Sequence, residues 1–308
     1  MSDMDLSSYN ANGNKKPENI EFDREQNFVH INASTHAQIK GYLEAFIETV
    51  VNKYKNNIVA EFDITSEYLK QPSTKGQRKP FHAAIIPPEI IRINMFERGF
   101  STSLGSTFEE CAKLIALQYH QNAVRGYNVT GKVSRSANDE IEHQVRAFEH
   151  AVEEGELRPT LQEMIDAVLE KSVASDEKIP LLAKADLYIR DKDGTQYFFE
   201  MKSPMPNKGQ CLEVLQRILR FHLLTNQRRP QVQGYFSMAY NPYGSKRSQY
   251  KWSFARMYTP YDEMILIGDE FWDKIIGPSG TMEELVQIYH EVGREKTKYM
   301  LDTLAFGF

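Results

Sequence analysis

Apolar residues recur at helical spacing in several parts of the chain, and this pattern predicts its helices. The first predicted helix covers residues 35–54, and Thr35 stands where it can cap the N-terminus of that helix. A second helix is predicted from near Ser103 to His120. The other predicted helices are two acidic ones between Asn138 and Val173, one over Leu212–Leu223, and a last one that Thr281 caps and that extends toward Leu304.

Shorter apolar or alternating runs between these helices predict strands over 127–133, 185–190, 196–202, 232–240 and 264–267. Strands separated by helices favour one α/β or α+β domain, which we place over residues 35–308. Residues 1–34 are rich in Asn, Ser, Asp and Lys, and we expect them to form a flexible N-terminal arm.

The strands over 185–190 and 196–202 are predicted to form a hairpin. Their loop contains Gly194, which supplies the positive φ that a three-residue hairpin loop needs. We expect Ala185, Leu187 and Ile189 to share one face of the first strand. In the second strand, Phe198, Glu200 and Lys202 share one face.

The register of this hairpin follows from centring its loop on Asp193. Arg190 then faces Gln196, Tyr188 faces Phe198, and Asp186 faces Glu200. Residues that face each other in an antiparallel pair have Cβ atoms about 4.5–5.5 Å apart. The hairpin therefore brings two carboxylates together, with Lys202 on the same face. A bulge at the turn would shift this register by one residue.

Two adjacent carboxylates repel unless a cation lies between them. Mg²⁺ suits oxygen ligands, polarises a phosphate and acidifies a bound water. A lysine beside such an ion can orient the water and neutralise charge that develops on phosphorus. Acid-x-Lys triplets also occur by chance, as in Asp176-Glu-Lys178, so the signal lies in their combination with the hairpin. The alternative is a surface ladder of salt bridges on an edge strand.

Composition and charge limit the function classes. The chain has 308 residues, 37 basic and 42 acidic, and a net charge of −5, but the segment from Lys184 to Arg256 carries 13 basic and 5 acidic residues. Such a block can form a positive cleft in an acidic protein. With two cysteines and no long apolar run, the sequence predicts a cytoplasmic protein without a disulfide framework or membrane span. Glycine-rich nucleotide loops, a serine-hydrolase elbow and zinc-type cysteine pairs are absent from the sequence.

The hairpin residues resemble the core of the PD-(D/E)xK nucleases, with Ala185 where that family often has proline. Further motifs resemble a family of type II restriction endonucleases. These motifs are Phe81-His-Ala-Ala-Ile-Ile-Pro-Pro-Glu-Ile, Phe96-Glu-Arg-Gly-Phe-Ser-Thr-Ser-Leu-Gly with Phe108-Glu, Asn241-Pro-Tyr, and Gly268-Asp-Glu-Phe-Trp-Asp. The resemblance implies a restriction-endonuclease-like α/β fold with a mixed central sheet flanked by helices. It also implies a homodimer that cuts double-stranded DNA at a short symmetric site with Mg²⁺, beside a cognate DNA methyltransferase.

The same resemblance implies roles for individual residues. Asp186, Glu200 and the Met201 carbonyl would hold the metal, and Lys202 would position the attacking water. A glutamate from the helix before the sheet often completes such sites. We assign Glu109 to this role and keep Glu110 as the competitor.

Basic residues outside the hairpin are candidates for DNA contact, and the sequence does not separate phosphate contacts from base contacts. They occur in a loop over 70–80, on the helix after the hairpin and in two later loops: Lys75, Arg78, Lys79, Arg217, Arg220, Arg228, Arg229, Lys246, Arg247, Gln249 and Lys251. The rival functions are another nuclease on the same core, such as a junction resolvase or repair nuclease, and a non-catalytic DNA-binding regulator.

Overall fold

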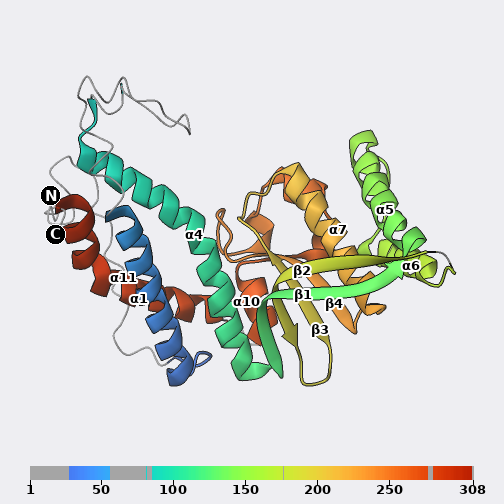
Figure 1. Cartoon of the computed structure of the whole chain (residues 1–308), viewed down its shortest axis with the longest axis horizontal. Coiled ribbons are helices and arrows are strands. Elements are labelled where there is room, and N and C mark those ends of the chain that lie inside the picture. The colour runs from blue at the N-terminus through green and yellow to red at the C-terminus, as the bar shows by residue number, and fades with distance from the viewer. Residues whose placement is uncertain (1–27, 56–80, 82–84, 176, 277–279, 307–308) are drawn as a thin grey trace, which may run out of the picture.

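A five-stranded sheet lies between two groups of helices (Figure 1) in the computed structural model, which describes residues 28–55, 81, 85–175, 177–276 and 280–306. Antiparallel pairing joins β1 to β2 and β2 to β3, whereas β3, β4 and β5 are parallel. This mixed sheet confirms the predicted α/β fold. In order across the sheet, the strands are β1 (Asn122–Ser134), β2 (Lys178–Arg190), β3 (Gln196–Met201), β4 (Val232–Met238) and β5 (Ile265–Ile267).

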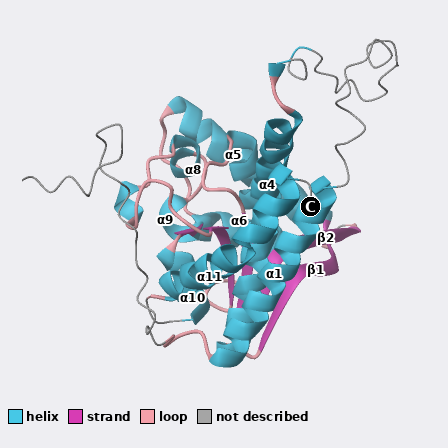
Figure 2. Cartoon of the chain, turned by 90° about the vertical axis from the view of Figure 1, so that its left-hand side faces the viewer, coloured by secondary structure: helices cyan, strands magenta, loops and turns pink. Residues whose placement is uncertain are grey.

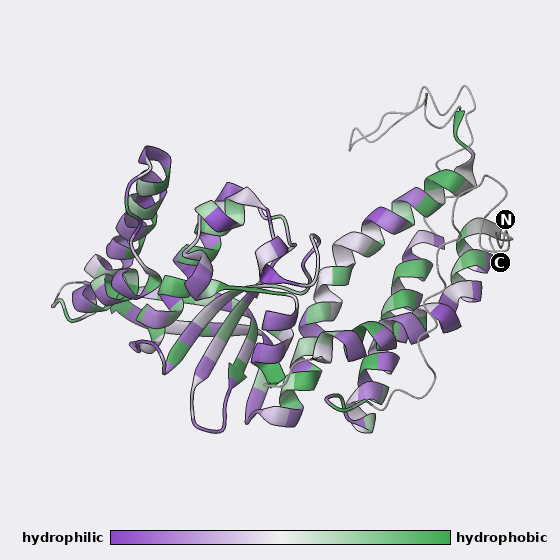
Figure 3. Cartoon of the chain, turned by 180° about the vertical axis from the view of Figure 1, so that it is seen from behind, coloured by the Kyte–Doolittle hydropathy of each residue, from purple (hydrophilic) through white to green (hydrophobic). Residues whose placement is uncertain are grey.

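The helices divide between the two faces of the sheet. One face is covered by α1 (Ala33–Lys55), α4 (Pro88–Tyr119), α10 (Asp269–Ile276) and α11 (Thr281–Leu301), which stand in front of the strands in Figure 2. The other is covered by α5 (Arg135–Glu154), α6 (Leu161–Ser172) and α7 (Lys208–Thr225). Hydrophilic positions dominate α5, which projects from the sheet (Figure 3). Three short helices, η2 (Arg247–Gln249), α8 (Ser253–Met257) and α9 (Tyr261–Met264), lie between β4 and β5, and η3 (Asp302–Phe306) follows α11.

The helix starts correct two predictions. Asn32, not Thr35, caps α1, because its Oδ1 accepts a hydrogen bond of 2.9 Å from the Thr35 amide while the Thr35 side chain is buried within the first turn. Gly280, in the left-handed region, occupies the N-cap of α11, and the predicted cap Thr281 is buried one residue later. Among the described helices, none is long and apolar enough to cross a membrane.

The segment before α1 belongs to the folded part of the molecule. Both carboxylate oxygens of Glu284 on α11 accept hydrogen bonds from the backbone amides of residues 29–31, and Ile31 is fully buried. The predicted boundary of the flexible arm at residue 34 is therefore too late. The rest of that predicted arm, 1–27, lies outside the described residues.

In β1 and β2, the alternation of side chains between the two faces of the sheet is interrupted at the same level. Leu187 and Ile189 pack with the α1 and α4 side, whereas Ala185 packs with the α7 side, so the prediction that these three residues share a face is wrong. In the β1–β2 register, Gly126 lies between the pairs Arg125–Leu187 and Tyr127–Ala185, which places it opposite Asp186. Gly126 has φ of 59°, a left-handed conformation that breaks the alternation of an extended strand.

Candidate active site

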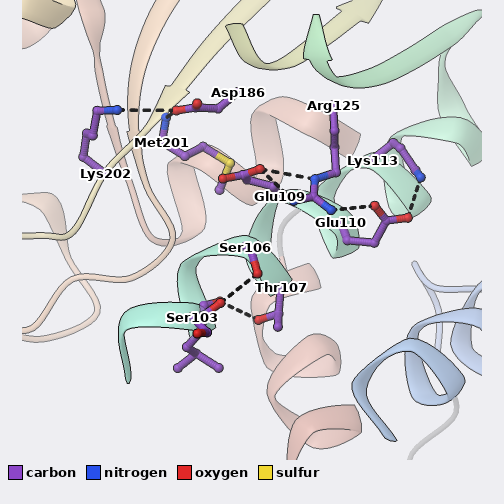
Figure 4. A network of polar contacts seen from close by, with 11 residues as sticks. Ser103, Ser106, Thr107, Glu109, Glu110, Lys113, Arg125, Asp186, Met201 and Lys202 are labelled. Atoms are coloured by element: carbon purple, nitrogen blue, oxygen red, sulfur yellow. Dashed lines mark hydrogen bonds and ion pairs between the residues drawn. The ribbon is translucent and has the colours of Figure 1, made fainter. Parts of the chain in front are cut away.

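The β2–β3 hairpin forms as predicted from its loop to the level of Leu187 and Phe199. The Asp191 amide donates to the Thr195 carbonyl at 2.8 Å, and Gly194 has φ of 91°. Beyond Leu187 the ladder ends, so Asp186 and Glu200 do not pair across it. Instead, Asp186 Oδ2 accepts a hydrogen bond of 2.8 Å from the Met201 amide (Figure 4). This bond fixes the Asp186 carboxylate at the C-terminal end of β3.

Lys202 joins the two carboxylates at this end of the sheet. Its Nζ lies 3.7 Å from Asp186 Oδ2 and 3.7 Å from Glu200 Oε2. The predicted meeting of the three side chains is thus observed. The ammonium stands between the two acids, where it offsets part of their repulsion.

Glu200 is buried without enough partners for its charge. The residue is 0% exposed, its Oε2 accepts a hydrogen bond of 2.7 Å from Arg217 on α7, and its Oε1 has no partner within the described residues. Burial and the Asp186 charge raise the pKa of Glu200 to about 8, although Arg217 and Lys202 oppose this shift. A cation that reached Oε1 would satisfy the oxygen and favour the charged form.

This donor set fits a hard divalent ion. Asp186 and Glu200 supply carboxylate oxygens at the end of β3, Met201 supplies a backbone carbonyl between Glu200 and Lys202, and such oxygens are the ligands that Mg²⁺ prefers. The described residues contain no group of three His, Cys, Asp or Glu side chains placed to hold a metal. The ion would therefore need further ligands beyond these two carboxylates and the carbonyl.

Glu109 approaches the same place from α4, on the opposite face of the sheet from Arg217. Its Oε2 accepts hydrogen bonds from Arg125 Nε at 3.2 Å and Nη2 at 2.9 Å (Figure 4). Burial, and then the nearby Asp186, raise the pKa of Glu109 against the effect of Arg125. Glu110 differs, because hydrogen bonds with Lys113 and Arg125 outweigh its burial and lower its pKa.

Comparison with known proteins identifies the family. A model of the type II restriction endonuclease family HinfI matches residues 35–293. The chain belongs to the HinfI family of type II restriction endonucleases. Its relatives include three type II restriction enzymes of Herpetosiphon aurantiacus. HgiEI is 40% identical over 274 residues, and HgiBI is 39% identical over 274 residues; each alignment covers 87% of this chain and 96% of the relative. HgiCII is 39% identical over 269 residues, which cover 87% of this chain and 97% of the relative. The resemblance inferred from the motifs is thereby confirmed.

In this HinfI-family protein the predicted DNA-contacting residues do not form one surface. Arg217 is held by Glu200 and Glu213. Arg220, one turn later on α7, is half-buried, and its Nε has no partner within the described residues. Lys75, Arg78 and Lys79 lie outside the described residues.

The basic loop that contains Arg228 and Arg229 lies at the edge of the sheet opposite to the catalytic residues. Arg228 and Arg229 precede β4, whose start lies beside the start of the parallel strand β3, whereas Lys202 follows the end of β3. Arg228 is also paired with Asp166 at 2.6 Å. These positions give no support to the prediction that the two arginines contact DNA beside the catalytic residues.

The second basic loop follows β4 on the same edge as Lys202. Tyr250 donates a hydrogen bond of 2.6 Å to the Pro204 carbonyl, and Trp252 donates one of 2.6 Å to the Pro206 carbonyl, so this loop is tied to the segment after Lys202. Lys246, Gln249 and Lys251 are exposed, although Gln249 Oε1 accepts a hydrogen bond from the Lys246 amide.

Arg247 has a structural role in this loop. Its guanidinium donates to the Ile265 and Tyr261 carbonyls and to Glu270, at 2.7–3.0 Å. These bonds hold the loop against β5 and α10, and the contact of Arg247 with DNA stays a prediction.

Two residues of the site were missed by the sequence reasoning. Gly126 and Arg125 precede the predicted strand 127–133, whereas β1 begins at Asn122. The Arg-Gly pair within an otherwise β-forming run is the signal that could have marked an irregular strand. The contact of Arg125 with Glu109 joins a strand to a helix and has no signature in the local sequence.

Proposed function

We propose that this protein is a Mg²⁺-dependent type II restriction endonuclease that hydrolyses double-stranded DNA at a short symmetric site. The observation that carries this proposal is Glu200, a fully buried carboxylate with one unpartnered oxygen, beside Asp186 and Lys202 at the end of β3. Because the chain belongs to the HinfI family of restriction endonucleases, we assign DNA as the substrate of this site.

In this proposal Asp186, Glu200 and the Met201 carbonyl hold Mg²⁺, which when bound polarises the phosphate and acidifies water. The Lys202 ammonium, 3.7 Å from both carboxylates, orients the attacking water and offsets negative charge near the phosphate. Glu109 completes the site from α4. Arg217 holds Glu200 at 2.7 Å and limits the freedom of its carboxylate.

DNA is proposed to approach the edge of the sheet where β3 and β4 end. The exposed Lys246, Gln249 and Lys251 lie in the loop that is tied to the segment after Lys202. Phosphate contacts by such cations release counterions, so we expect steep salt dependence of DNA binding.

A homodimer follows from the proposed symmetric site, since two copies related by a two-fold axis place one active site on each strand. We further propose that the protein acts in the cytoplasm, where a cognate DNA methyltransferase protects the same sites. That enzyme is a functional partner and need not bind this chain.

Substitution of the central residues tests the proposed function. We expect Asp186→Asn and Lys202→Met to abolish the cutting of plasmid DNA in Mg²⁺ while DNA binding is largely retained. Asp193→Asn and Lys192→Met are matched controls at the tip of the hairpin, on the opposite edge of the sheet, and should cut normally. Unchanged cutting by both Asp186→Asn and Lys202→Met would overturn the assignment.

The products distinguish the rival functions. Discrete fragments with defined ends, lost on chelation of Mg²⁺, support a restriction endonuclease. Smeared products or cutting confined to branched DNA would instead indicate another nuclease on the same core. Binding without cutting in the unmodified protein would indicate a DNA-binding regulator.

A further inference from the structure

Arg125 stands between two adjacent acidic residues of α4. Its Nε and Nη2 both donate to Oε2 of Glu109, and its Nη1 donates to Oε2 of Glu110 at 3.0 Å. Arg125 lies on β1 directly before Gly126, the residue opposite Asp186. One guanidinium therefore links α4 to the part of the sheet that carries Asp186.

The two glutamates are held unequally. Glu110 is an ion-pair partner of both Lys113 and Arg125, which compensate its charge. Glu109 is held by Arg125 through Oε2 alone, and no hydrogen bond of its Oε1 is found among the described residues. Figure 4 shows the Glu109 carboxylate between Arg125 and the side of the site occupied by Met201 and Asp186.

The opposite side of α4 is fixed as well. Thr107 Oγ1 and the Tyr289 hydroxyl of α11 lie 2.7 Å apart, and Cys111 Sγ lies 3.5 Å from the same hydroxyl. Thr107 and Cys111 flank Glu109 in the sequence and are fully buried. The helix is thus held on one side by α11 and on the other by Arg125, which leaves the Glu109 carboxylate little freedom to rotate away.

We propose that Arg125 is a positioning residue that aims Glu109 at the metal site and thereby raises its affinity for a divalent cation. This inference rests on the proposed function, because it takes Asp186 and Glu200 as the primary ligands. It also selects Glu109 over Glu110 as the acidic residue that α4 contributes. Partners that orient a metal ligand typically contribute about 10–100-fold to metal affinity.

The test measures Mn²⁺ binding to the full chain without DNA, by isothermal titration calorimetry or by the electron paramagnetic resonance signal of free Mn²⁺. We expect Arg125→Met and Glu109→Gln each to raise the Kd for Mn²⁺ about 10-fold or more. Arg125→Lys should recover part of this loss. Glu110→Gln and the exposed Arg190→Met should shift the Kd less than about 3-fold.

A double variant separates positioning from general destabilisation. If Arg125 acts through Glu109, Arg125→Met with Glu109→Gln should bind Mn²⁺ no more weakly than either single variant. Additive losses, or a normal Kd in Arg125→Met, would overturn the inference. If Arg125→Met fails to fold, Arg125→Lys and Glu109→Gln still test the role of Arg125. A normal Kd for Mn²⁺ in both variants would contradict the proposal.

Asp186→Asn distinguishes failure of the inference about Arg125 from failure of the proposed function. Loss of Mn²⁺ binding in Asp186→Asn, together with normal binding in Arg125→Met, would reject only the role of Arg125. Normal binding and cutting in Asp186→Asn would reject the metal site itself.

Discussion

Replacement of the buried Glu200 by glutamine should stabilise the metal-free protein in a pH-dependent way. The folded chain holds the pKa of Glu200 at about 8, against 4.5 for an ordinary glutamate, because the carboxyl is buried beside Asp186. Between these two values the folded chain keeps a proton that the unfolded chain loses. The free energy of unfolding therefore falls as the pH rises from 4.5 to 8, and this contribution is constant above pH 8.

The magnitude follows from the size of the shift. Each pKa unit corresponds to about 1.4 kcal/mol, so Glu200 costs about 3 kcal/mol at pH 7 and about 5 kcal/mol above pH 8. Glutamine has nearly the same shape and cannot ionise. Glu200→Gln should therefore match the original protein in stability below about pH 4.5 and exceed it by these amounts at higher pH.

Urea unfolding in the presence of a chelator, at pH 5, 6, 7, 8 and 9, measures the difference. Glu213→Gln is the matched control, since Glu213 pairs with the same Arg217 but is 53% exposed. It should change the free energy of unfolding by less than about 0.5 kcal/mol at every pH. A Glu200→Gln difference that is flat from pH 5 to 9, or a less stable glutamine variant at pH 8, would refute the reasoning.

Divalent metal should offset most of this difference in stability at pH 7. A ligand at 100 times its Kd stabilises the folded state by about 2.7 kcal/mol. We expect Mg²⁺ to stabilise the original protein and to have little effect on Glu200→Gln, which should also fail to cut DNA. Metal affinity should rise with pH up to about 8, because binding displaces the Glu200 proton.

Three further substitutions test the fold and the DNA-binding surface. Gly126→Ala should lower the free energy of unfolding in urea by about 1–3 kcal/mol and slow cutting, because the φ of Gly126 is 59° and the new Cβ would lie 3.2 Å from Lys184 Cε. Gly105→Ala, in open space on α4, should instead stabilise the protein by about 0.5–1 kcal/mol. Equal effects of the two substitutions would contradict this account. Glu284→Ala should cost about 1–3 kcal/mol and speed proteolysis before α1, since three backbone amides lose their acceptor; unchanged proteolysis would argue against it. Lys251→Ala should weaken DNA binding and lower the slope of log binding constant against log salt concentration by about 1, without altering stability. Arg247→Ala should lower the stability of the protein. If Lys251→Ala lowered stability and Arg247→Ala reduced the salt slope, the two assigned roles would be exchanged.

The sequence could predict the hairpin because its determinants are local. Alternating residues and a glycine at the left-handed position define the loop and its register to the level of Leu187 and Phe199. The start of α4 was harder to predict from its apolar pattern. Its apolar positions near the N-terminus, including Ile90 and Ile93, are exposed and form no regular inner face, so the helix was predicted only from Ser103. The Pro87-Pro88 pair was the available signal, because proline favours the first helical position.

The partners of the site residues could not be predicted in the same way. Arg217 meets Glu200, and Arg125 meets Glu109, only through the packing of α7 and α4 on opposite faces of the sheet. Parallel pairing of β3 and β4 likewise decides that Arg228 lies at the edge remote from Lys202. Charge along the sequence identified candidates, but the topology decides which of them come together.

The break in strand alternation at Gly126 explains how one aspartate can serve both layers of helices. In an unbroken strand, Asp186 would share the face of Tyr188, which packs toward α7 together with Glu200 and Arg217. Glu109 comes from α4 on the other face, yet it is close enough to Asp186 for that charge to raise its pKa. The change of face at Gly126 lies at the level of Asp186, so we expect the left-handed glycine to help bring acids from both layers together. We therefore expect Gly126→Ala to weaken Mn²⁺ binding, whereas an equally destabilising substitution in the core around α6 should not.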